Sequence, residues 1–382
     1  WLDNNKKSGL MNLDFSDDQK LLQSEARTFL EKEQSLQRSR SVLNQQEALD
    51  TDLWQQIVAM GWTGIRIPEQ YDGLGLGHLE LCVVAEELGR SLAPLPFSSS
   101  VYLFTEAIIK FASDEIKQDL LPKLVTGECI GTLAITEQLL APTAQNINTT
   151  VANNAVSGTK IAVPDAGIAT HVIVICNGQK GIELRLVELS DDCNIQKQDT
   201  IDDSRGHFSI DFNNANSQLL GHHGAGWRLL QNLLDQAAVM FSFEQLGGAQ
   251  ATLDMATSYA QQRFAFGRAI GSYQAIKHKL ADMYIKLTLA KSNSYYGAWA
   301  LSTESAELAV AAATARVSAT QAFNYCSQEN IQTHGGNGFT WEYDCHLFYR
   351  RAKLLSLNVG SLATWKEKLI HGLEKAQPAN AQ

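Results

Sequence analysis

The chain has 382 residues, 45% of them hydrophobic, and a formal net charge of -10 at pH 7. At roughly 150 residues per domain, this length predicts two or three domains and excludes a single small module. The acidic balance argues against nonspecific nucleic-acid binding, because that binding depends on clustered Lys and Arg.

No apolar run reaches the ~18 residues that a membrane span needs, and the first residues lack the apolar core of a secretory signal. We therefore expect a cytoplasmic protein without a membrane span. The six cysteines form no CxxC pair and show no zinc-like spacing. We expect them to be reduced and mostly buried, and we expect no metal site.

Residues 11–130 are predicted to form an all-helical domain. Apolar residues recur at spacings of three and four from Leu21 to Leu30 and again from Leu53 to Met60. A turn-rich segment, PEQYDGLGLG, follows at 68–77, and an amphipathic helix is predicted over 79–88.

Residues 131–225 change to a period of two, which predicts a β-sheet or β-barrel domain. The predicted strands lie at 149–151, 155–157, 171–175 and 184–187, separated by Asn, Gly and Asp turns. Residues 226–382 return to helical periodicity, which predicts a C-terminal four-helix bundle with helices at 227–263, 275–302, 306–334 and 348–374. The expected fold class is therefore α+β and multidomain.

Two motifs in the last domain carry most of the functional information. The first is QRFAFGR at 262–268, followed by SYQAIKHKLADM at 272–283. The second is IQTHGGNGF at 331–339, followed by YRRAK at 349–353. These motifs, in this order, resemble those of the acyl-CoA dehydrogenases, and the predicted order of helices, strands and bundle resembles the same family.

The resemblance implies an FAD cofactor that lies between the strand domain and the bundle, with its adenine half held by a neighbouring subunit. It also implies an acyl-CoA substrate and an electron-transfer flavoprotein as electron acceptor. The expected assembly is a homo- or hetero-oligomer built as a dimer of dimers. No GxGxxG motif follows a strand, so a Rossmann site is not supported.

By its motif position, Arg263 would face the FAD pyrophosphate, since a guanidinium matches the geometry of oxyanions. Alone, such an arginine is more typical of a solvated helix end. The resemblance places further cofactor-binding positions at Thr136, Phe266, Gln274, Gln332, Gly335, Gly336 and Ser361. The two glycines would let the backbone approach the partner subunit's FAD closely.

The middle domain departs from the family pattern. Thr136 and Glu137 are kept, but QLLAPT at 138–143 replaces the small glycine-serine loop that should bind pyrophosphate. Where relatives place a tryptophan and a threonine against the flavin ring, this chain has AVPD at 162–165. We therefore expect weak FAD binding, or a vacant ring side of the site.

Desaturation of an acyl-CoA requires a carboxylate that removes the α proton while hydride leaves for the flavin. The two positions that hold this carboxylate in the family correspond here to Val359 and Ala237. Glu244 lies two helical turns after Ala237 in an apolar run, where a raised pKa would suit a general base. The alternative for Glu244 is a structural ion pair with an Arg or Lys of the bundle.

Three functions stay open on the sequence. One is an FAD-dependent acyl-CoA dehydrogenase with a displaced base, with Glu244 as the candidate catalytic residue. The second is a catalytically silent subunit that completes the FAD site of a competent relative. The third is a flavin monooxygenase or oxidase on the same fold, because reduced flavin can carry the oxygen chemistry without this carboxylate.

Overall fold

A computed structural model describes residues 15–45 and 49–376, so the predicted outer domain limits at 11 and 382 lie outside the described residues. The first part is helical, as predicted. Helix α1 begins with a capping box, in which Ser16 and Gln19 each bind the other's backbone N–H. The helices are α1 (Asp17–Lys32), α2 (Ser35–Gln45), α3 (Thr51–Ala59), α4 (His78–Arg90), the π-helix η3 (Ser98–Thr105), α5 (Glu106–Phe111) and α6 (Asp114–Val125).

The middle part is a closed barrel. Strand pairs β4–β5, β5–β7, β7–β3, β3–β2 and β2–β4 form a complete ring, while β1 pairs with β4 and β6 with β7. The strands are β1 (Gly131–Ala134), β2 (Thr150–Ala152), β3 (Ala155–Pro164), β4 (His171–Gly178), β5 (Gly181–Glu188), β6 (Cys193–Gln198) and β7 (His207–Leu220). The periodicity predicted β2 to β5 but missed β1, β6 and the long β7.

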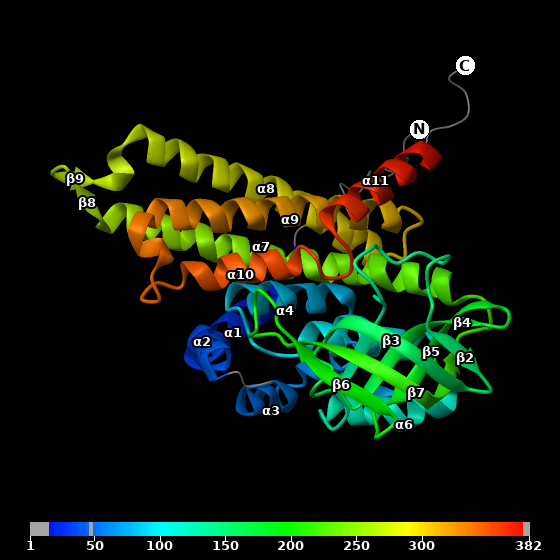
Figure 1. Cartoon of the computed structure of the whole chain (residues 1–382). Helices are drawn as coiled ribbons and strands as arrows, with labels where there is room; N and C mark the ends of the chain where they lie inside the picture. The colour runs from blue at the N-terminus through cyan, green and yellow to red at the C-terminus, as the bar shows by residue number, and fades with distance from the viewer. Residues whose placement is uncertain (1–14, 46–48, 377–382) are drawn as a thin grey trace, which may run out of the picture.

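The last part is the predicted helical bundle, in which α7, α8 and α9 run side by side (Figure 1). The fold class is confirmed. The elements are α7 (Gly226–Gln262), the hairpin β8 (Phe264–Ala265) and β9 (Arg268–Ala269), α8 (Gln274–Ser302), α9 (Leu308–His334), the 3-10 turn η5 (Gly335–Phe339), α10 (Cys345–Leu355) and α11 (Leu362–Ala376).

The prediction of one helix over 348–374 was wrong, because the chain breaks between α10 and α11. Val359 and Gly360 both adopt positive φ, at 55° and 113°, which a continuous helix does not allow.

No described helix is long and apolar enough to cross a membrane.

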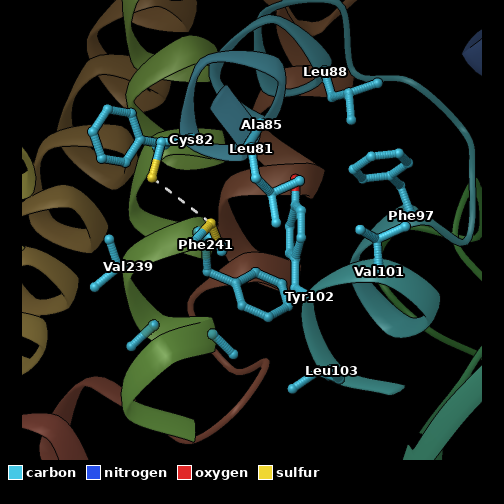
Figure 2. Packing of buried hydrophobic residues seen from close by; sticks show 14 of the residues in the cluster. Leu81, Cys82, Ala85, Leu88, Phe97, Val101, Tyr102, Leu103, Val239 and Phe241 are labelled. Carbon is cyan, nitrogen blue, oxygen red and sulfur yellow. Dashed lines mark hydrogen bonds between the residues drawn. The ribbon is translucent and has the colours of Figure 1, made fainter. Parts of the chain in front are cut away.

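The helical domain and the bundle share one core, centred where α4 lies against α7. The two backbones approach so closely that a Cβ on Gly89 would stand 1.9 Å from the Glu244 carbonyl oxygen. Next to this crossing, the Tyr102 ring meets Phe241 edge-on at 5.6 Å, and Cys82 lies 3.7 Å from the Met240 sulfur (Figure 2). All six cysteines are buried, as predicted, and none is paired with another in this structure.

Candidate functional site

The residues of the first motif lie exposed at one end of the bundle. Helix α7 ends at Gln262, and the β8–β9 hairpin projects beyond the bundle (Figure 1). Phe266 takes φ 52° at the hairpin turn and is 97% exposed, while Arg263 and Gln274 are also exposed at the flanking helix ends. These side chains are therefore free to bind something outside this chain.

The second motif reaches the same end of the molecule. Gln332 is exposed in the last turn of α9, and Gly335 follows with φ 60°. A Cβ on either Gly335 or Gly336 would have no atom within 4 Å, so both backbones face open space. His334 stacks on Tyr259 at 4.1 Å, one helical turn before Arg263, and this contact brings the two motifs together.

A cavity of about 450 Å³ opens beside Gln332, between the end of α9, η5 and α10. Its wall combines aromatic rings, two amides and one guanidinium, and it includes no carboxylate. The lining residues are Gln328, Ile331, Gln332, Gly338, Phe339, Trp341, His346, Tyr349 and Arg350. Aromatic faces and amides suit a heterocyclic base, and the cation suits an attached phosphate.

Arg350 is held in place at this cavity. Its Nη1 donates to the Ile201 carbonyl oxygen at 3.0 Å, and its guanidinium lies 5.9 Å from the centre of the Trp341 ring. Trp341 also meets His346 edge-on at 4.5 Å, and burial lowers the pKa of His346. The positive charge at the cavity thus comes from Arg350. The sequence predicted no role for Arg350, although it lies in the YRRAK motif, and none for Trp341.

In the barrel part of the expected FAD site, polar groups are bound to one another within the chain. Thr136 is half-buried just after β1, and its carbonyl oxygen accepts from the Ile161 N–H at 2.8 Å. Both Glu137 oxygens accept backbone N–H groups, from Asn148 at 2.6 Å and Thr149 at 2.9 Å. The Glu137 carboxylate therefore occupies these two backbone N–H groups, and Leu139 stands fully exposed on the following loop.

Lys160 completes the Glu137 ion pair at 2.7 Å and is itself buried. Burial alone would raise the pKa of Glu137, but the hydrogen bonds from Lys160 and the two backbone N–H groups lower it from 4.5 to about 2. The folded-state pKa is depressed, so this stabilisation is complete above about pH 4.5 and is lost as the pH falls toward about 2.

We expect Glu137→Gln to lower the free energy of unfolding at pH 7, and the difference from wild type to shrink as the pH falls from 4.5 toward 2. Urea denaturation at a series of pH values measures this difference. The exposed Glu128→Gln serves as the matched control and should follow wild type throughout. A difference that does not change with pH would contradict this role for the ion pair.

The residues that the resemblance places at the ring side of the site do not have the groups that a flavin ring needs. Strand β3 has an irregular register between Lys160 and Val163, and Ala162 adopts φ 52° there. Ala162 supplies only a methyl group where a flat wall is needed, and Pro164 has no N–H to donate. Asp165 turns inward instead and accepts from the Ser99 hydroxyl at 2.5 Å.

Ala237 and Val359, the two positions where the resemblance implies a catalytic base, carry no acid. Ala237 is fully buried in α7. Val359 lies in the break before α11, where its carbonyl oxygen accepts from the Trp365 indole N–H at 3.2 Å. Ser361 directly precedes α11, and its hydroxyl accepts from the Thr364 N–H at 3.3 Å. The structure thus places Ser361 at a helix start.

Glu244 is fully buried and ion-paired. Its Oε1 accepts from Arg205 Nη2 at 2.6 Å, and Arg351 Nη1 lies 4.0 Å away. Arg351 of α10 is a bundle cation, as the structural alternative expected, but the shorter contact comes from Arg205, which belongs to the barrel domain. The second oxygen of Glu244 has no hydrogen-bond partner among the described residues.

Comparisons with known proteins agree with the motifs. The family model "Acyl-CoA dehydrogenase, N-terminal domain" matches residues 16–128, and "Acyl-CoA dehydrogenase, C-terminal domain" matches residues 224–369. The chain is 29% identical to the mitochondrial isovaleryl-CoA dehydrogenase of Solanum tuberosum, over 82% of this chain and 80% of that protein. It is 28% identical to the acyl-CoA dehydrogenase IpdE2 of Mycolicibacterium smegmatis, over 88% of this chain and 93% of that protein.

Among solved structures, the chain resembles Tcur3481-Tcur3483, described as a steroid ACAD. The TM-score is 0.85 and the sequence identity 27%, over 94% of this chain and 98% of that chain.

Proposed function

The chain belongs to the acyl-CoA dehydrogenase family, and from this premise we propose that it is one subunit of a flavin-dependent acyl-CoA dehydrogenase complex. A related partner subunit supplies the catalytic carboxylate and the flavin-ring site. The observation that carries the proposal is an asymmetry within this chain. The bundle end offers Arg263, Gln332 and an open cavity, whereas the barrel side offers neither a ring wall nor a base.

The bundle end fits the adenine and pyrophosphate half of an FAD. Arg263 would bind the pyrophosphate, the turn at Gly335 and Gly336 would allow close backbone approach, and the cavity beside Gln332 would take the adenine. When bound, the flavin supplies the hydride acceptor. This chain's contribution is to hold and orient the other half of the cofactor.

The burial of Glu244 argues against the first of the three functions, a self-sufficient enzyme with Glu244 as its base. A general base must come within hydrogen-bond reach of the proton it abstracts. Glu244 has no exposed surface, and its Oε1 accepts a hydrogen bond from Arg205 at 2.6 Å. To take a proton from a substrate, the carboxylate would first have to leave this ion pair.

Exposed apolar side chains support assembly with a related subunit. Helix α8 leaves Tyr284, Ile285 and Leu289 between 53% and 62% exposed, and Phe264 and Phe266 of the hairpin are 64% and 97% exposed. Such a surface is typical of an interface. An acyl-CoA thioester as substrate and an electron-transfer flavoprotein as acceptor complete the proposal for the assembled complex.

The proposal is tested by the visible spectrum of the chain purified alone and after co-expression with a family member that keeps the glutamate before Gly-Thr. We expect the chain alone to retain no stoichiometric FAD, and the co-purified complex to be yellow and to bleach anaerobically with acyl-CoA. A chain that alone holds one FAD per molecule and bleaches with acyl-CoA would refute the proposal, as would failure of every such relative to form a flavin-containing complex.

Within the complex, Arg263→Ala should weaken FAD retention by at least about tenfold, because a charge-assisted contact to the pyrophosphate is lost. Lys180→Ala, on the β4–β5 turn of the barrel, serves as the matched control and should retain FAD like wild type. Equal retention by both variants would remove Arg263 from the cofactor site.

A further inference from the structure

Charged side chains from several separate segments meet in the interior, where the barrel contacts the bundle. Six of these charged residues are each at most 4% exposed. We call this group the junction cluster, and it comprises Asp165, Asp202, Arg205, Glu244, Arg316 and Arg351. Its three carboxylates balance its three guanidinium groups, so the loss of any single charge leaves the cluster with a net charge.

The ion pairs of the cluster join α7 to α10 through the β6–β7 loop at 199–206. Arg205, at one end of the loop, binds Glu244 of α7 at 2.6 Å and the Ser98 hydroxyl of η3 at 2.9 Å. Asp202, in the same loop, accepts from Arg351 Nε of α10 at 2.6 Å. The loop is thus held on one side by a carboxylate of α7 and on the other by a guanidinium of α10.

This docking extends directly to the cavity described above. Arg350 and Arg351 are consecutive in α10, and they bind Ile201 and Asp202, which are consecutive in the loop. Arg350 also lines the cavity. A shift of the loop against α10 would therefore either break the Arg350–Ile201 hydrogen bond or move Arg350, the one cation among the cavity-lining residues.

We infer that Glu244 is a positioning residue, which fixes the 199–206 loop against α10 and through it sets the Arg350 wall of the cavity. Loss of its charge leaves Arg205 and Arg351 buried with an excess of positive charge, and an uncompensated buried charge drives local opening. The inference rests on the proposed function only in taking the cavity as the adenine end of an FAD site.

The test is amide hydrogen exchange of the full chain, followed by peptide over 199–206 and 345–355. In Glu244→Gln we expect exchange at least about tenfold faster in both segments, because the excess positive charge left on Arg205 and Arg351 opens them together. The matched control is Glu106→Gln, since Glu106 is equally buried but pairs with Arg66 at 2.9 Å and His78 at 3.3 Å inside the helical domain. It should leave both segments unchanged.

A second variant separates charge from packing. Glu244→Gln combined with Arg205→Met removes one charge of each sign, so exchange in 345–355 should return toward the wild-type rate. If Glu244→Gln does not fold, hydrogen exchange of Asp202→Asn tests the same inference, because this variant removes the carboxylate charge through which the loop binds Arg351. Wild-type exchange in both segments of either single variant would overturn the inference, as would equal acceleration in Glu106→Gln.

These readouts need no flavin, so the inference and the proposed function can fail separately. If the chain alone reduces flavin with acyl-CoA, the proposed function fails whatever the exchange rates. If Glu244→Gln abolishes that reduction while exchange stays at the wild-type rate, Glu244 acts as the base and the positioning role is wrong.

Discussion

An Arg351→Met variant will lose about 3–5 kcal/mol of unfolding free energy, because it leaves buried carboxylates without their counter-ion. Arg351 is 1% exposed and donates to Asp202 at 2.6 Å and to the Ser204 hydroxyl at 2.9 Å. Methionine keeps the apolar stem and removes the charge, so the loss measures the ion pairs rather than a cavity. Urea denaturation at pH 7 provides the free energies.

Lys123→Met is the matched control for Arg351→Met. Lys123 and its partner Asp119 are 41% and 60% exposed, and such a surface pair contributes about 0.5 kcal/mol or less. If Arg351→Met costs no more than this control, then the junction cluster does not hold the barrel to the bundle.

A single methyl group at Gly247 should destabilise the chain by about 3 kcal/mol or more, because two helix backbones touch there. A Cβ on Gly247 of α7 would stand 1.8 Å from the Glu86 carbonyl oxygen of α4 and 2.7 Å from the Arg90 nitrogen. Neither is a side chain that can turn away. Alanine gains helix propensity of only about 1 kcal/mol over glycine, so the steric term dominates.

The thermal midpoint and the soluble yield of Gly247→Ala measure this effect. Gly336→Ala is the control for stability, since its Cβ would have no atom within 4 Å. Gly247→Ala with the thermal midpoint of wild type would mean that α4 and α7 can separate without cost, which would contradict the tight crossing.

The sequence was sufficient to predict the long helices. It was not sufficient to predict elements whose structure depends on contacts between residues far apart in the chain. Periodicity predicted α7, α8 and α9 nearly to their ends, because their apolar faces persist over many turns. It missed the break at Val359, where a β-branched residue takes a left-handed conformation that local preference opposes. It also missed β7, whose NNANSQ segment reads as a turn but pairs with β3 and β5 in the barrel.

The candidate site divides in the same way. Motif resemblance placed Arg263 and Gln332 in one site, and the structure brings their helix ends together through Tyr259 and His334. The nearer partner of Glu244, Arg205, could not be predicted, because it precedes Glu244 by 39 residues and lies in another domain. No local pattern marks Arg205 as buried. The place of Trp341 in the candidate site likewise could not be predicted, because it depends on the cavity that Trp341 lines together with residues of α10.

The buried cysteines link the chemical lifetime of this chain to its conformational opening. Burial raises the pKa of Cys176, Cys326 and Cys345 to about 12, so in the folded molecule these sulfurs stay protonated and unreactive. A molecule that opens exposes thiols of ordinary acidity, which oxidants can convert to sulfenic acids or cross-links. Oxidative loss of this protein will therefore follow the frequency of opening, and a stabilised variant will also resist oxidation.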